Sequence, residues 1–196
     1  MRDETWLHGP MRARLVPLVL AAAVGFAACG SSGGTTQADP AAPSLESIDG
    51  VVVEAATGAN HIQGDLDYPD SPPSGGDHNP FWQDCGFYDA PIFDETAVHA
   101  MEHGVVWLAY SPDLSADDVS SVRKAFELGD GRTIASPYPG VDVLEVVAWK
   151  HRLVVSEVDD PRVEQFIEAA RSGAHAPEPG ASCQEGFGEV SETGLP

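Results

Sequence analysis

The chain has 196 residues, a length that suits one domain with tails and leaves little room for two independent cores. It carries 31 Asp and Glu residues against 10 Lys and Arg residues, a formal net charge of −21. Such an acidic surface repels nucleic acid and anionic lipid headgroups, so we expect neither as a partner. The same charge keeps an exported protein soluble and attracts cations.

The N-terminal segment has the order of a secretory signal peptide. Arg12 and Arg14 precede the apolar run Leu15–Ala28. This run is shorter than the roughly 20 residues that a membrane helix needs, so we expect it to be cleaved and not to span the membrane. Met11 begins a better-proportioned signal than Met1, and the sequence leaves open which of the two starts translation.

The signal segment ends in Phe26-Ala27-Ala28-Cys29, which resembles the lipobox of bacterial lipoproteins. In that motif the cysteine sulfur is acylated and the cysteine becomes the new N-terminus. The motif predicts an extracytoplasmic protein whose only attachment to the cell membrane is a lipid on Cys29. The alternative is a secreted protein that is cut after Ala28 and keeps a free cysteine.

Composition divides the rest of the chain. The stretch after the cysteine is rich in Gly, Ser and Pro and has almost no large apolar side chains, so it cannot bury enough surface to order itself. We therefore expect a signal peptide at 1–28, a disordered tether at 29–46, a single domain at 47–184 and a disordered tail at 185–196.

The elements of the domain follow from hydrophobic periodicity, helix-start residues and turn residues. A turn-rich segment with many prolines separates the first strand from the rest. In chain order we expect a strand at 51–55, the irregular segment at 57–91, a helix at 94–103, a strand at 105–110, a helix at 115–128, strands at 133–136, 144–149 and 153–158, and a helix at 160–171. This order predicts an α+β fold, a single two-layer domain with a mostly antiparallel sheet and helices packed on it.

Two cysteines remain for the folded domain if Cys29 carries lipid. Cys85 and Cys183 form an even pair in an oxidising compartment, where a disulfide is the default. The bond would fasten the C-terminal tail to the middle of the domain. The alternative, a metal-binding or redox thiol, lacks a Cys-x-x-Cys spacing.

The sharpest local motif is His99-Ala-Met-Glu-His103. Residues four apart share one face of a helix, so both imidazoles could reach one ion. The string also fits His-x-x-Glu-His, the inverted zinc-peptidase motif, in which Glu102 would activate water. A structural alternative is that both histidines interact with the dipole at the C-terminal end of the helix.

Further histidines precede this helix, in the irregular segment. His61 and His78 lie in loops that could fold over the helix and supply more ligands. Several imidazoles, with Met101 nearby, suit copper or zinc better than magnesium or calcium, which prefer all-oxygen sites. The sequence thus predicts a copper or zinc site built from His78, His99 and His103, joined by His61.

Other catalytic signatures are missing from the sequence: it has no Gly-x-Ser-x-Gly elbow, no phosphate-cradling loop and no dinucleotide fingerprint. We therefore lean towards a metal-binding protein that is not an enzyme, a carrier, buffer or structural site. A zinc hydrolase with Glu102 as general base is one alternative, and an interaction protein without metal is another. The sequence indicates no particular protein partner.

Several separated motifs together resemble the domain of unknown function 3105 family. They are Tyr68-Pro-x-x-Pro-Pro-Ser-Gly-Gly-Asp-His78, Trp82-x-x-Cys-Gly-x-Tyr88, Val98-His-Ala-Met-Glu-His-Gly104, Ser136-Pro-Tyr-Pro139, Ala148-Trp149 and Pro177-Glu-Pro-Gly-Ala-Ser-Cys183. The resemblance covers roughly residues 50 to 184. It departs from the usual family pattern in the run before His78 and at Met101, but neither departure removes a histidine. It implies an exported or membrane-tethered protein and carries no assigned activity.

Overall fold

A computed structural model of the protein describes residues 43–55, 58–191 and 194–196. The predicted signal peptide, the lipid site at Cys29 and the tether as far as residue 42 lie outside the described residues. Within the described ranges, no helix combines the length and the apolar character that crossing a bilayer requires.

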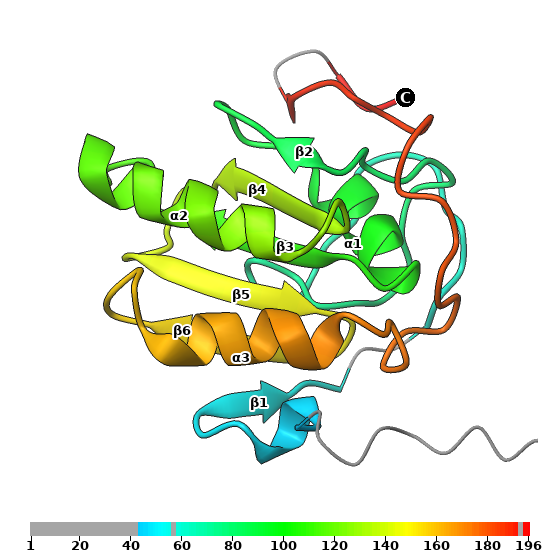
Figure 1. Cartoon of the computed structure of the whole chain (residues 1–196). Coiled ribbons are helices and arrows are strands. Elements are labelled where there is room, and N and C mark those ends of the chain that lie inside the picture. The colour runs from blue at the N-terminus through cyan, green and yellow to red at the C-terminus, as the bar shows by residue number, and fades with distance from the viewer. Residues whose placement is uncertain (1–42, 56–57, 192–193) are drawn as a thin grey trace, which may run out of the picture. The chain divides into compact units, whose positions relative to one another are not determined.

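One mixed β-sheet organises the described part of the chain (Figure 1), with strand order β1–β6–β5–β3–β4–β2. The pairs β1/β6, β6/β5 and β5/β3 are antiparallel, whereas β3/β4 and β4/β2 are parallel. The strands are β1 (Val51–Val53), β2 (Gly86–Phe87), β3 (Val106–Tyr110), β4 (Thr133–Pro137), β5 (Leu144–Ala148) and β6 (His151–Val155). The α+β prediction is confirmed.

Helices cover both faces of this sheet. The helices are α1 (Asp94–Glu102), α2 (Ala116–Leu128) and α3 (Pro161–Ala170). Along β3, Leu108 packs in an apolar cluster with residues of α2 and α3, and Trp107 packs in a second cluster with residues of α1. The two-layer arrangement expected from the sequence would put the helices on one face only. Every residue of β3 is buried, however, as expected for a strand that is covered on both sides.

The helix ends follow local chemistry. The hydroxyl of Ser115 caps α2 by accepting a hydrogen bond from the Asp118 backbone N–H at 3.2 Å, and Asp160 precedes Pro161 at the start of α3. Helix α1 ends one residue earlier than expected, with His103 as its C-cap and Gly104 turning the chain at φ +89°. Gly104 adopts this left-handed backbone, which favours glycine, just before β3.

The hairpin from β5 to β6 turns more tightly than the sequence indicates. We expected a connection at residues 150–152, but β6 already begins at His151, and Lys150 takes a positive φ of 61° in the turn. The guanidinium of Arg152 pairs with Glu54 and Glu145 at 2.6 and 2.8 Å. These two carboxylates let a charged side chain lie within a buried strand.

The irregular segment covers the α1 side of the sheet and is fastened to the C-terminal part of the chain. The predicted disulfide between Cys85 and Cys183 is confirmed, with Cα atoms 5.4 Å apart. The tail expected to be disordered from residue 185 instead packs beside residues 82–84. The Phe187 backbone N–H donates to the Trp82 carbonyl at 2.8 Å, because this irregular stretch offers free backbone groups for pairing.

Ordered structure also begins earlier than the expected domain start at residue 47. A short 3-10 helix spans Leu45–Ser47, and the Leu45 side chain is buried in the apolar cluster under α3 together with Ile48. Part of the segment that we expected to be tether is therefore packed against the domain.

Candidate metal centre

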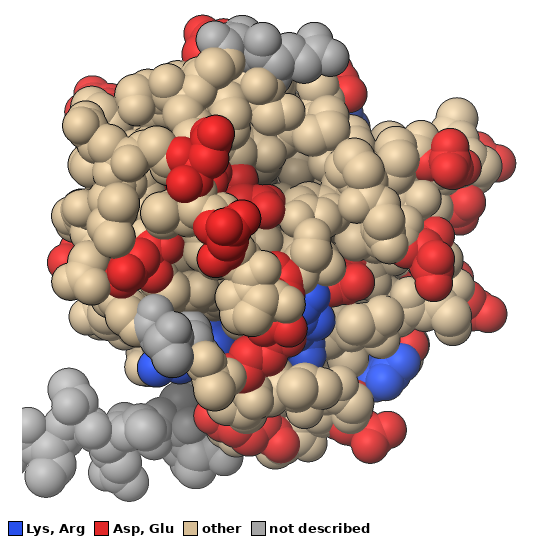
Figure 2. Space-filling view, turned by 180° about the vertical axis from the view of Figure 1, so that it is seen from behind, with Lys and Arg blue, Asp and Glu red and all other residues tan. Residues whose placement is uncertain are grey.

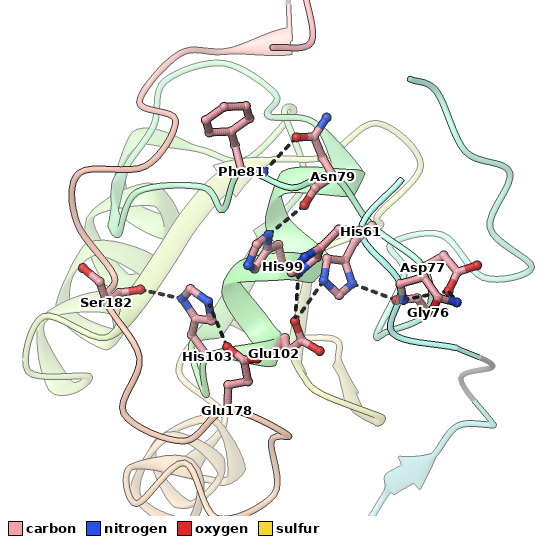
Figure 3. Close-up of polar contacts among 12 residues, drawn as sticks. His61, Gly76, Asp77, Asn79, Phe81, His99, Glu102, His103, Glu178 and Ser182 are labelled. Atoms are coloured by element: carbon pink, nitrogen blue, oxygen red, sulfur yellow. Dashed lines mark hydrogen bonds and ion pairs between the residues drawn. The ribbon is translucent and has the colours of Figure 1, made fainter. Parts of the chain in front are cut away.

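Helix α1 supplies two of the polar side chains of the site. His99 and Glu102 are three residues apart, which places them on the same face of the helix (Figure 3). The whole helix after its first residue is buried, His99 and Glu102 included. Burying polar groups in this way requires partners, since an unpaired carboxylate inside a protein is costly.

The partners come from the irregular segment. His61 and His78 pair as an isolated parallel β-bridge, in which the Ile62 N–H donates to the His78 carbonyl at 2.7 Å. The His78 N–H in turn donates to the Asn60 carbonyl at 3.0 Å. The carboxylate of Asp77 accepts both the backbone and the side-chain N–H of Asn60, at 2.9 and 2.8 Å.

These elements converge on one small volume. A donor atom from each of His61, His78, His99 and Glu102 lies within 4.8 Å of the other three, and we call these four residues the histidine group. Glu102 Oε2 lies 3.0 Å from His78 Nε2 and 3.6 Å from His61 Nε2. In a tetrahedral zinc site, bonds of about 2.0 Å place the ligand atoms about 3.3 Å apart. On binding an ion, those ligand atoms that now lie up to 4.8 Å apart would therefore have to move closer together.

Two of the rings are already oriented for an ion. His78 Nδ1 lies 2.8 Å from the Gly76 carbonyl, and His99 Nδ1 lies 2.7 Å from the Asn79 carbonyl. A carbonyl oxygen only accepts, so both Nδ1 atoms carry the proton and both Nε2 atoms keep a lone pair while the ring is neutral. Metal-ligating histidines show the same arrangement, donating their other ring N–H to a carbonyl or carboxylate.

This arrangement leaves an electrostatic conflict at His78. Its Nε2 is fully buried and, among the described residues, has no hydrogen-bond partner of satisfactory geometry, although Glu102 Oε2 lies 3.0 Å away. A lone pair on the neutral ring would face a carboxylate, which also offers only lone pairs. The conflict is removed when a cation lies between the two atoms.

Protonation of the histidine rings is disfavoured in this buried site. Burial lowers the pKa of His78, although the Gly76 carbonyl and Glu102 oppose this effect. Burial also lowers the pKa of His99 to about 3, and the neighbouring His78 ring adds to the shift while the Asn79 carbonyl opposes it. Both rings therefore favour the neutral form that binds metal ions.

The structure does not bring His103 into this group. Its Nδ1 lies 2.6 Å from the Ser182 carbonyl, and its Nε2 lies 3.8 Å from Glu178 Oε2. The ring is close to that of His99, with centroids 4.7 Å apart, but its nitrogens face the C-terminal tail. His103 keeps helical backbone geometry as the C-cap of α1, so its ring still lies beside that of His99, but its nitrogens are directed at a tail that the disulfide holds nearby.

Sequence reasoning considered Glu102 only as a catalytic base. The structure shows it as one of the four donors, three residues after His99 on the same helix. The signal that could have identified it is the His-x-x-Glu spacing, since residues three apart also share a helical face. Met101, by contrast, is fully buried in the apolar cluster between α1 and the sheet.

Two tryptophans lie against the histidine rings. The Trp82 ring is 5.7 Å from that of His99, and the Trp149 ring is 6.0 Å from that of His78, measured between centroids. Trp149 is buried and Trp82 is half-buried. They place two fluorophores next to any ion that binds there.

Comparison with known proteins identifies one family. The family model described as a protein of unknown function (DUF3105) matches residues 61–185. No curated protein and no solved structure matches the chain. The matched range includes every residue of the histidine group and both cysteines of the disulfide.

Proposed function

This chain belongs to the DUF3105 family, and from the geometry of its histidine group we propose that it binds a transition metal ion, zinc or copper, outside the cytoplasm. The ligands are His61, His78, His99 and Glu102. One observation carries the proposal: the buried Nε2 of His78 lies 3.0 Å from the Glu102 carboxylate without a satisfactory hydrogen bond, while Nδ1 of the same ring is bonded to the Gly76 carbonyl.

The donor set supports the choice of metal. Three imidazole nitrogens and one carboxylate oxygen suit Zn(II) or Cu(II), whereas Mg(II) and Ca(II) prefer oxygen alone. Soft sulfur ligands select Cu(I), and the thioether of Met101 is buried in the apolar cluster. The geometry thus favours the divalent ions over Cu(I).

The proposed location outside the cytoplasm rests on the N-terminal sequence and on the disulfide. The signal-like run, followed by Cys29, supports export and lipid anchoring at the cell membrane. A disulfide between Cys85 and Cys183 fits an oxidising compartment. The bound ion would be held by a tethered domain, which suits a metal carrier, buffer or structural site.

The position of Glu102 favours metal binding over hydrolysis. A general base must be free to take a proton from water, whereas Glu102 lies among the donors, at 3.0 and 3.6 Å from two histidine nitrogens. The zinc hydrolase alternative would be favoured if Glu102→Gln removed a hydrolytic activity and left the metal content unchanged.

The decisive measurement is metal content after loading. The protein, purified without a histidine tag, is loaded with Zn(II) or Cu(II), freed of excess ion by gel filtration and analysed by mass spectrometry of the elements. Wild type should retain about one ion per chain. His99→Ala should bind more weakly by at least the roughly 10–100-fold that losing an outer-shell partner of a metal ligand costs, since it loses a ligand itself. Binding of Cu(II) should also quench the fluorescence of Trp82 and Trp149.

The matched control is His103→Ala, which removes a second histidine from the same end of α1. It should retain metal as wild type does, because its nitrogens face Ser182 and Glu178. Thermal unfolding of each variant separates loss of a ligand from loss of the fold. Equal, weak binding by wild type and His99→Ala would refute the proposal and favour an interaction protein without metal.

A further inference from the structure

His61 differs from the other three donors in its exposure. The side chain of His61 is 47% exposed, whereas those of His78 and Glu102 are 0% and 5% exposed. His99 is also buried. An ion held by these residues would therefore meet solvent, or another molecule, on the side of His61.

His61 also differs in how its ring is held. The rings of His78 and His99 are each fixed by a hydrogen bond from Nδ1 to a backbone carbonyl. Among the described residues, the structure gives the His61 ring no such bond. It gives the ring contacts to two other imidazoles, at 5.0 and 4.6 Å between centroids, and the approach of Nε2 to Glu102.

The backbone that carries His61 is attached at few points. Residues 58–66, which we call the His61 segment, are held by the β-bridge to His78, by the bonds of Asn60 to Asp77 and by the Leu66 N–H donating to Glu95 at 2.8 Å. The other donors stand on the buried helix α1 or, in the case of His78, at a fully buried position of the irregular segment. The His61 segment is thus the part of the site that can move away at the lowest cost.

Resting on the metal binding proposed above, we propose that His61 is the exchangeable ligand through which the ion enters and leaves. The buried His78, His99 and Glu102 form the fixed part of the site. Exchange needs an acceptor that presents a nitrogen or sulfur donor atom. The acceptor atom forms a bond to the metal while the bond to His61 Nε2 breaks, the imidazole leaves as a neutral ring, and no electron is transferred.

The charge around this entrance suits a cation. Residues 58–77 contain four aspartates and no lysine or arginine, the aspartates being Asp65, Asp67, Asp70 and Asp77. Figure 2 views the domain from the side opposite to α2 and α3, and acidic side chains are spread over that face. Such a surface raises the local concentration of a divalent ion and favours its approach.

The test follows release of Zn(II) from the loaded full-length protein to a chromogenic zinc chelator under rapid mixing. For wild type, the release rate should rise with chelator concentration, because the chelator takes the place of His61. His61→Ala should still bind about one Zn(II) but should release it on the order of tenfold faster or more, since one bond is already absent. His103→Ala, the matched control, should release at the wild-type rate.

A second variant leaves all four ligands in place. Asp77→Ala removes the acceptor that holds Asn60, so it should loosen the His61 segment and speed release without changing the stoichiometry. The inference is overturned if release from wild type is independent of chelator concentration and unchanged in His61→Ala, or if His61→Ala loses the ion as His99→Ala does. Wild type that holds no Zn(II) at the start would instead refute the metal-binding proposal itself.

Discussion

Asp94, at the first position of α1, shows how a single residue can couple the fold to pH. Its Oδ2 accepts a hydrogen bond from the Tyr138 hydroxyl at 3.0 Å, and that hydroxyl lies 2.7 Å from Ser71 Oγ. Burial raises the pKa of Asp94 to about 6, and Glu95 adds to the shift while Tyr138 opposes it. The folded protein therefore holds a proton here that the unfolded chain releases.

We predict that this residue makes folding less favourable as the pH rises. Between the unfolded pKa of about 4 and the folded pKa of about 6, the folded state binds more protons, so the free energy of unfolding falls. Chemical denaturation of wild type and Asp94→Asn from pH 4 to 8 measures this. The stability of wild type relative to the variant should fall by on the order of 2 kcal/mol up to about pH 6 and then stay level.

Asp70→Asn, which removes a carboxylate at an exposed position, is the matched control. A constant difference between wild type and Asp94→Asn over the whole range would contradict the assignment to Asp94.

At the scale of elements, the end of α1 decides which side chains enter the site. Helix α1 stops at Glu102, and Gly104 then takes a φ of +89° that directs the chain into β3. A Cβ built on Gly104 would lie 2.9 Å from the Cα of Gly173, in the loop after α3. The helix end, β3 and the C-terminal loop are therefore packed backbone against backbone.

We predict that Gly104→Ala destabilises the fold through two separate effects. The positive φ costs about 1 kcal/mol, and the contact with Gly173 adds to this because neither backbone can easily shift. Gly131→Ala provides the comparison, since Gly131 has a similar φ of +82° but open space at the Cβ position. Urea denaturation should show a clearly larger loss of unfolding free energy for Gly104→Ala than for Gly131→Ala. Equal losses would mean that the contact with Gly173 does not contribute to stability.

At the scale of the whole molecule, two parts of the chain far apart in sequence are joined on the α1 side. The disulfide spans a sequence separation of 98 residues, and the tail it holds supplies the Ser182 carbonyl to His103. Within the described part of the chain, the four residues of the histidine group come from the irregular segment and α1. The tail also contacts the end of α1 through its backbone, since the Glu178 N–H donates to the Glu102 carbonyl at 3.0 Å. It thus stabilises the fold and positions His103, but it supplies none of the four proposed ligand atoms.

The double variant Cys85→Ser/Cys183→Ser should lose about 2–5 kcal/mol of stability, because the unfolded chain gains the freedom of a long loop. At a temperature where it remains folded, it should bind Zn(II) with close to wild-type affinity. Denaturation and zinc titration on the same sample measure both quantities. Loss of zinc binding by a folded variant would show that the tail takes part in the metal centre.

The sequence by itself predicted the three helices, five of the six strands, the disulfide pair and three of the four residues of the histidine group, and it missed β2 (Gly86–Phe87) inside the irregular segment. Helix-start residues, apolar runs and glycines act over a few neighbours, so α1, α2 and α3 were predicted to within one or two residues at each end. Only the tertiary structure decided that helices cover both sheet faces and that Glu102 replaces His103 in the histidine group. The direction of His103 depends on Ser182 and Glu178, and these contacts arise from packing between segments that no local pattern relates.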